Sequence, residues 1–124
     1  MCHDHPMPTA LVVDDHPSFR RFARRLLEAG GFVVVGEAED GASALARARD
    51  TQPDVVLLDV LLPDANGFEV AELLAAEPRR PVVVLTSSRS ADDLGASLDR
   101  TSARGFISKR DLTAESLATM VGEL

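Results

Sequence analysis

At residues 54–59 the chain reads Asp-Val-Val-Leu-Leu-Asp, and at residues 81–86 it reads Pro-Val-Val-Val-Leu-Thr. Neither run of apolar residues alternates with polar ones, which indicates strands that are buried on both faces. Strands of that kind are typical of a parallel sheet that helices cover on both sides. The two segments therefore predict the centre of an α/β fold.

Three shorter apolar runs bring the predicted strands to five, at Leu11–Val13, Phe32–Val35 and Phe106–Ile107. Between the runs, apolar residues recur at intervals of three and four, which predicts amphipathic helices. The five predicted helices are a first from Pro17 to Gly30-Gly31, a second from an Asp40 cap to Pro53, a third through Val70, Leu73 and Leu74, a fourth from a Ser90 cap through Leu94 and Leu98, and a fifth from a Thr113 cap through Leu117, Met120 and Val121 to Leu124. This strict alternation predicts a doubly wound, five-stranded parallel sheet.

The composition excludes several classes of protein. The 124 residues are 45% hydrophobic and 27% charged, which fits one globular domain. No apolar run approaches the ~20 residues of a transmembrane helix, so we expect no membrane protein. A formal net charge of -7 opposes binding to the phosphates of nucleic acids. A single cysteine and an N-terminus without the features of a secretory signal indicate a cytoplasmic setting.

Polar residues follow four of the five predicted strands, at the edge where such sheets bind ligands. These residues are Asp14-Asp15 after the first strand, Asp59 after the third, Thr86-Ser87 after the fourth and Ser108-Lys109 after the fifth. The second strand ends in Gly36-Glu37, to which we assign no role because that strand is peripheral. Clustered carboxylates favour a hard divalent cation such as Mg2+, and Lys109 and Thr86 add a positive charge and a hydrogen-bond donor. The set predicts phosphoryl transfer.

A purely structural interpretation of the same residues stays open from the sequence. Asp14 and Asp59 would be helix N-caps, and Lys109 would be a surface charge that neutralises them. Four strands that each end in a suitable polar residue favour the functional interpretation.

At these positions the sequence resembles the receiver domain of two-component response regulators, of which the chemotaxis receiver is the smallest form. The resemblance extends from Thr9 to Leu124. It rests on Leu11-Val-Val-Asp-Asp15, on Leu58-Asp-Val-Leu-Leu-Pro-Asp-Ala-Asn-Gly67, on Thr86-Ser87 and on Gly105-Phe-Ile-Ser-Lys109. It implies a flavodoxin-like strand order 2-1-3-4-5, with a flexible tail over residues 1–8 and the receiver domain over residues 9–124.

The resemblance also implies a signalling switch with only weak phosphotransfer and autophosphatase activity of its own. Asp59 would accept a phosphoryl group from a phosphohistidine on a histidine kinase or a histidine phosphotransfer protein. The Mg2+ ligands would be Asp15, Asp59 and the backbone carbonyl of Leu61 directly, and Asp14 mainly through water. Lys109 would pair with a phosphoryl oxygen. Thr86 and Phe106 would pass the state of the site to the face formed by helix four, strand five and helix five.

The sequence departs from the common family pattern at three of its positions. Arg110 follows Lys109 where many members have proline, and it resembles the subfamily linked to helix-turn-helix output domains. Leu61 replaces a residue that is often polar. Phe106 lacks the hydroxyl of members with tyrosine. The resemblance thus leaves open whether an output domain or a dimer forms through helices four and five.

Other functions are compatible with parts of the sequence. A haloacid-dehalogenase-type phosphohydrolase also uses Asp, Mg2+, Thr and Lys, but its nucleophile lies on the first strand, whereas Asp59 follows the third. A nucleotide- or flavin-binding module lacks support because residues 14–18 contain no glycine for a phosphate-binding loop. A degenerate receiver that acts only through protein contacts is a further alternative.

Two charged or metal-ligating groups of residues have alternative interpretations. The first helix carries four arginines, which form either a docking surface for the phosphohistidine partner or a solvated face: Arg20, Arg21, Arg24 and Arg25. Cys2, His3 and His5 could ligate a metal, although we expect a tail without fixed geometry.

Overall fold

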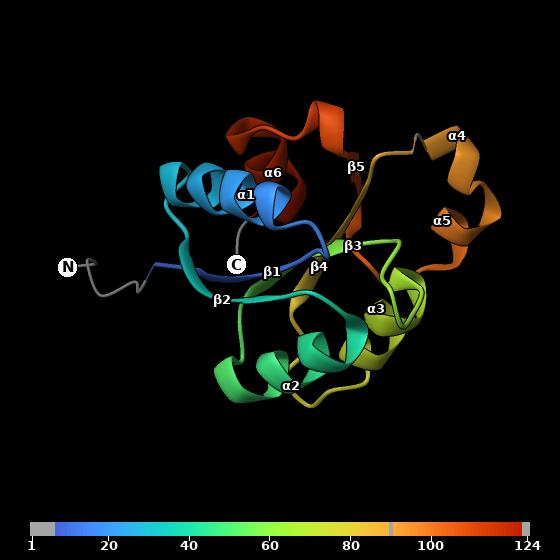
Figure 1. Cartoon of the computed structure of the whole chain (residues 1–124), viewed down its shortest axis with the longest axis horizontal. Coiled ribbons are helices and arrows are strands. Elements are labelled where there is room, and N and C mark those ends of the chain that lie inside the picture. Colours follow the sequence, from blue (N-terminus) through green and yellow to red (C-terminus); the bar gives the residue numbers. More distant parts are fainter. Residues whose placement is uncertain (1–6, 90, 123–124) are drawn as a thin grey trace.

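The computed structural model describes residues 7–89 and 91–122. Five parallel strands form one sheet in the order β2-β1-β3-β4-β5 (Figure 1), which confirms both the predicted sheet and its strand order. The strands are β1 (Thr9–Val13), β2 (Val33–Ala38), β3 (Val55–Asp59), β4 (Val82–Ser87) and β5 (Gly105–Ser108). The unbroken apolar runs within residues 54–59 and 81–86 lie in the neighbouring central strands β3 and β4.

Helices cover both faces of the sheet (Figure 1). They are α1 (Pro17–Ala29), α2 (Gly41–Thr51), α3 (Gly67–Ala75), α4 (Ala91–Leu94), α5 (Ala96–Arg100) and α6 (Ala114–Val121), with a short 3-10 turn η2 (Lys109–Asp111). One face carries α1 and α6, and the opposite face carries α2 and α3. None of the described helices is long and apolar enough to cross a bilayer.

The predicted starts of the second and fifth helices are confirmed. Asp40 accepts a hydrogen bond from the backbone N–H of Ser43, and Thr113 does the same for Ser116. In both cases the serine side chain bonds back to the backbone of the cap residue, which completes a capping box. These local signals act within four residues, so they need no tertiary structure.

The prediction of one continuous fourth helix is wrong. Two short helices, α4 and α5, replace it, and they meet at Gly95, whose φ is 51°. Residues with a side chain rarely adopt this backbone conformation, whereas glycine does so at little cost. The predicted Ser90 cap lies outside the described residues, as do Leu124, Cys2, His3 and His5.

The second strand is longer than predicted. It begins at Val33 rather than Phe32 and continues through Gly36 and Glu37 to Ala38. Pairing with β1 extends it, because Leu11 pairs with Gly36 and Val13 with Ala38. Neighbouring strands thus override the local signal of Gly36, and Glu37 lies inside the sheet instead of following it.

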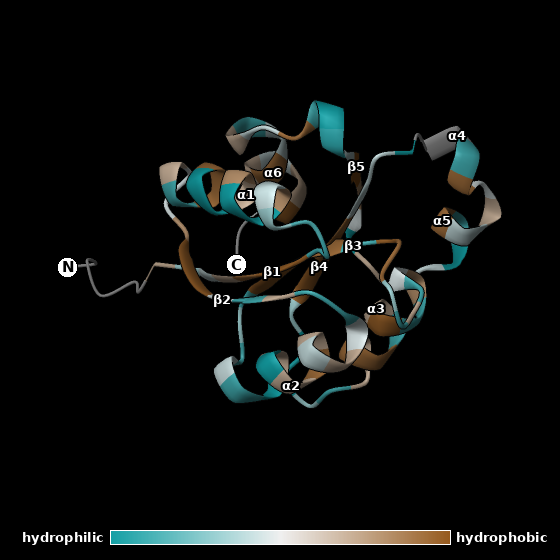
Figure 2. Cartoon of the chain, in the orientation of Figure 1, coloured by the Kyte–Doolittle hydropathy of each residue, from teal (hydrophilic) through white to brown (hydrophobic). Residues whose placement is uncertain are grey.

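Two apolar cores flank the sheet, and Figure 2 shows the central strands as mainly hydrophobic. Every residue of β3 is buried, as its unbroken apolar pattern predicts. Leu73, which the helical spacing places in an apolar stripe, is 51% exposed instead, and Phe22 of α1 is 42% exposed. Each lies at the margin of a stripe whose neighbours, Ala23 and Leu74, are buried.

Candidate functional site

The carboxyl edge of the sheet gathers the buried polar side chains of the described residues. Asp14 and Thr86 are fully buried, and Asp59 and Ser87 are 4% and 3% exposed. Asp14 follows β1, Asp59 ends β3, and Thr86 and Ser87 end β4. Burial of carboxylates carries a large cost unless partners compensate it, so this edge indicates a functional site.

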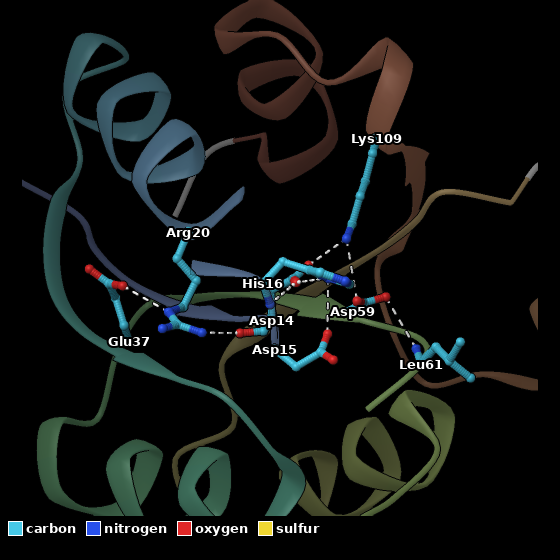
Figure 3. A network of polar contacts seen from close by, with 8 residues as sticks. All are labelled: Asp14, Asp15, His16, Arg20, Glu37, Asp59, Leu61 and Lys109. Atoms are coloured by element: carbon cyan, nitrogen blue, oxygen red, sulfur yellow. Dashed lines mark hydrogen bonds and ion pairs between the residues drawn. The ribbon is translucent and has the colours of Figure 1, made fainter. Parts of the chain in front are cut away.

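Asp14, Asp15 and His16 form an acidic loop after β1 (Figure 3). The backbone N–H of His16 donates to Asp14 Oδ1 at 2.8 Å. The Nδ1 atom of His16 lies 3.1 Å from Asp14 Oδ1 and 3.1 Å from Asp15 Oδ1. Together with Asp59, these three residues offer ligand atoms that all lie within 4.8 Å of one another. The loop therefore brings together the donor set for a cation.

Lys109 reaches this cluster from η2, at the opposite side of the site (Figure 3). Its Nζ lies 2.6 Å from Asp14 Oδ2 and 3.4 Å from Asp59 Oδ2. The ammonium also lies 4.3 Å from the centre of the Phe19 ring on α1, which is a cation–π contact. Only 18% of the lysine side chain is exposed, so these interactions are weakly screened.

The backbone after β3 holds Asp59 in place. The N–H of Leu61 donates to Asp59 Oδ1 at 3.1 Å. Gly67 begins α3 against the same strand end, and its N–H donates to the carbonyl of Val60 at 2.7 Å. A Cβ atom on Gly67 would collide with the Asp59 carbonyl and would lie 2.7 Å from the Val60 Cα. This close approach of two backbones requires glycine.

The pKa values of the two buried carboxylates are shifted in opposite directions. Burial raises the pKa of Asp59 to about 6; the charge of Asp14 adds to this rise, while the Leu61 N–H and Lys109 oppose it. Burial acts on Asp14 in the same way, but the interactions with Lys109 and His16 prevail and lower its pKa below the ordinary value. The ammonium therefore stabilises mainly the charge of Asp14, its nearer partner.

Thr86 lies beside Asp59 because the two residues pair across β3 and β4. Its hydroxyl is buried and has no hydrogen-bond partner among the described residues. On the other side, Thr86 pairs with Ile107 of β5. The preceding Phe106 is partly buried and packs against the same core as the partly buried Leu94 of α4. Thr86 thus connects the acidic cluster to the strand that carries Phe106.

The interpretation of Asp14 and Asp59 as helix N-caps is wrong. His16 is the N-cap residue of α1 and Asn66 is that of α3, so neither Asp14 nor Asp59 caps a helix. Lys109 is not a surface charge either, because it is paired with both buried carboxylates.

Three residues at this site have roles that could not be predicted from the sequence. His16 bridges the two carboxylates of the acidic loop, Phe19 contacts Lys109, and Glu37 binds two arginines of α1. Only the position of His16 next to Asp15 gave a local signal. The sequence pattern indicates only an apolar helix position for Phe19 and only the end of a peripheral strand for Glu37.

The model of a protein family described as the response regulator receiver domain matches residues 10–121. This chain belongs to that family. The match confirms the resemblance found in the sequence. A receiver domain is a signalling fold and not a dedicated enzyme, which excludes the haloacid-dehalogenase alternative.

Relatives and solved structures agree with this membership. A Pseudomonas aeruginosa PAO1 protein whose name describes a transcriptional regulator is 42% identical over 112 residues, 90% of this chain and 54% of the relative. EvgA, a DNA-binding transcriptional activator of Escherichia coli K12, is 30% identical over 102 residues, 82% of this chain and 50% of EvgA. The signal receiver domain of NarL from Mycobacterium tuberculosis is 32% identical with a TM-score of 0.81, covering 96% of this chain and all of that domain. The receiver domain thus spans about half the length of these two regulators.

Proposed function

We propose that this receiver domain is a phosphorylation-dependent switch of a two-component phosphorelay, with Asp59 as the phosphoacceptor. The observation that carries the proposal is the buried carboxylate of Asp59 at the end of the central strand, between the Asp14–Asp15 loop and Lys109. The donor is a phosphohistidine on a histidine kinase or a histidine phosphotransfer protein. Family membership supports partners of this class.

The residues of the acidic cluster fit a bound Mg2+. Asp14, Asp15 and Asp59 supply hard carboxylate oxygens, and the side chain of Asp15 is 36% exposed, so the cluster opens to solvent. Asp15, Asp59 and the carbonyl of Leu61 would hold the ion directly, and Asp14 mainly through water. When bound, Mg2+ supplies positive charge that offsets carboxylate repulsion and stabilises the oxygens of the transferring phosphoryl group.

Phosphoryl transfer then depends on how the protein places its own groups. A carboxylate oxygen of Asp59 attacks phosphorus, a P–O bond forms, and the P–N bond of the donor breaks. Lys109 already lies 3.4 Å from Asp59, so it can pair with a phosphoryl oxygen after a small movement. The unpaired hydroxyl of Thr86 gains an acceptor in the new phosphoryl group.

The output of the switch is a change on the face formed by α4, α5, β5 and α6, which corresponds to the predicted face of helix four, strand five and helix five. Thr86 moves toward the phosphoryl group, and Phe106 turns inward behind it. An output domain or a dimer contacting this face would read the change. Two relatives that are named as transcriptional regulators are about twice as long as the matched segment, and this length supports an output domain.

The cytoplasmic setting remains a prediction from the sequence, as does the flexible tail of residues 1–8.

Incubation with phosphoramidate and Mg2+ tests the proposed function. We expect one phosphoryl group per chain, stable in acid and labile in base, as for an aspartyl phosphate. A chain that stays unlabelled with small-molecule donors and with a panel of phosphorylated histidine kinases would instead be a degenerate receiver acting through protein contacts alone.

Replacing Asp15 by Asn is expected to weaken Mg2+ binding without destabilising the metal-free protein. The substitution removes a direct ligand of the ion. The Mg2+ affinity should therefore fall by more than roughly tenfold, because tenfold is already the typical loss when a residue that only orients a metal ligand is replaced. It also relieves carboxylate repulsion, so stability without metal should hold or rise. Thermal melts with and without Mg2+ measure both effects, and Asp50→Asn, an exposed position on α2, is the control. Equal Mg2+ stabilisation in the parent and in Asp15→Asn would refute the assignment.

Replacing Thr86 by Val is expected to uncouple phosphorylation from the output face. The variant should still accept a phosphoryl group at Asp59, but beryllofluoride with Mg2+ should no longer shift the NMR signals of Phe106 and α4. Its unfolding free energy should rise by about 1 to 2 kcal/mol, because the change removes a buried hydroxyl without a partner. If Phe106 responds equally in the parent and in the variant, Thr86 does not transmit the signal.

A further inference from the structure

Arg20 of α1 reaches back to the main chain of the acidic loop (Figure 3). Its Nη1 donates to the backbone carbonyl of Asp14 at 2.6 Å. Its Nε donates to Glu37 Oε1 at 3.0 Å, and only 16% of the arginine side chain is exposed. The guanidinium is therefore engaged on two sides and joins β2 to the end of β1.

Glu37, which accepts the hydrogen bond from Arg20, is itself held in place by the sheet and by a second arginine. It lies inside β2, where it pairs with Val12 of β1, so its backbone belongs to the sheet. Its second carboxylate oxygen accepts a hydrogen bond from Nε of Arg24 at 3.1 Å. With both oxygens bound and its backbone in a strand, Glu37 holds the planar guanidinium of Arg20 in one orientation.

The contact with Asp14 acts on both carboxylates of the loop. The carbonyl of Asp14 and the N–H of Asp15 share one planar peptide group. β1 ends at Val13, and the N–H of Asp14 makes a last bond to the carbonyl of Ala38. Beyond that bond, the hydrogen bonds of the sheet no longer hold the backbone. The contact with Arg20 fixes the plane of the peptide group between Asp14 and Asp15, and with it the directions in which the two acidic side chains leave the backbone.

We infer that Arg20, oriented by Glu37, is a positioning residue for the cation-binding pair Asp14 and Asp15. This inference deepens the proposed function and rests on it. Arg20 acts through the main chain and touches neither the cation nor the phosphoryl group. Two of the four arginines of α1 thus have structural partners in Glu37, while Arg21 and Arg25 lie exposed on the helix.

Arg20→Met tests the inference, with Arg24→Met as the matched control. Both variants remove one arginine from Glu37, but only Arg20 contacts Asp14. We expect Mg2+ affinity, measured by calorimetry, to fall roughly tenfold in Arg20→Met and to change little in Arg24→Met. Without metal, the carbonyl carbon of Asp14 and the amide nitrogen of Asp15 should shift in NMR spectra of Arg20→Met only.

Two variants of Glu37 complete the test. Glu37→Gln keeps an oxygen acceptor for Arg20 and should retain most of the Mg2+ affinity, whereas Glu37→Ala should lose it in the same direction as Arg20→Met. Equal Mg2+ affinity and unchanged Asp14 and Asp15 signals in Arg20→Met and Arg24→Met would overturn the inference. Failure of the parent to take up a phosphoryl group would overturn the proposed function instead, because the metal-free NMR shifts do not depend on phosphorylation.

Discussion

Asp59→Asn is expected to abolish phosphoryl incorporation completely. The neutral amide of asparagine cannot form the acyl phosphate, while its shape matches that of the carboxyl group. The fold should remain intact, since the substitution removes a buried charge without leaving a cavity. Labelling with phosphoramidate and Mg2+, followed by peptide mapping, measures the effect.

Asp64→Asn is the control for this experiment. Asp64 lies on the same loop after β3, but its carboxylate accepts hydrogen bonds from the N–H groups of Gly41 and Ala42 at the start of α2. This variant should incorporate phosphoryl groups like the parent, even if it loses some stability. Labelling that persists in Asp59→Asn would assign the phosphoacceptor to another residue and refute our proposal.

The metal-free protein is expected to lose stability as the pH rises from about 4 to 6, through Asp59. In the folded chain the pKa of Asp59 is about 6, above the ordinary aspartate value of 3.8. Below about pH 4 the group is protonated in both the folded and the unfolded chain. Between the two pKa values only the folded chain keeps the proton, so deprotonation of Asp59 progressively destabilises the fold. The free energy of unfolding falls through this effect by roughly 3 kcal/mol at most by neutral pH.

Asp14 contributes in the opposite direction, because its pKa is lowered in the folded state. Its contribution is present above the ordinary carboxyl range and is lost as the pH falls. The two effects overlap in the parent protein, so a comparison with a variant is needed to separate them.

Urea unfolding of the parent and of Asp59→Asn between pH 4 and pH 7.5, with the metal chelated, isolates the effect of Asp59. We expect the variant to be increasingly more stable than the parent as the pH rises to about 6, with a constant difference above that. Added Mg2+ should reduce the difference by stabilising the parent. A difference that does not change with pH would show that burial of Asp59 carries no such cost.

The short-range sequence signals predicted the architecture well. The unbroken apolar residues of β3 and β4 predicted buried central strands, and alternation with helices predicted the doubly wound sheet. The caps at Asp40 and Thr113 were predictable because a cap and its partner lie three residues apart. The polar residues of the site were predictable from one rule, since the carboxyl ends of parallel strands meet at one edge.

The sequence by itself thus determined the topology, the edge of the sheet that holds the site and the residues Asp14, Asp59, Thr86 and Lys109 that gather there. Only the tertiary structure decided which of these groups pair. Lys109 and Asp14 lie far apart in the chain, and their 2.6 Å contact depends on how β5 is placed by its crossover. Arg20 and Glu37 meet for the same reason: residues 17 positions apart become neighbours because β2 extends beyond its local signal and α1 packs beside it. Periodicity and caps report burial and backbone direction, whereas such pairings depend on side chains brought together from different elements.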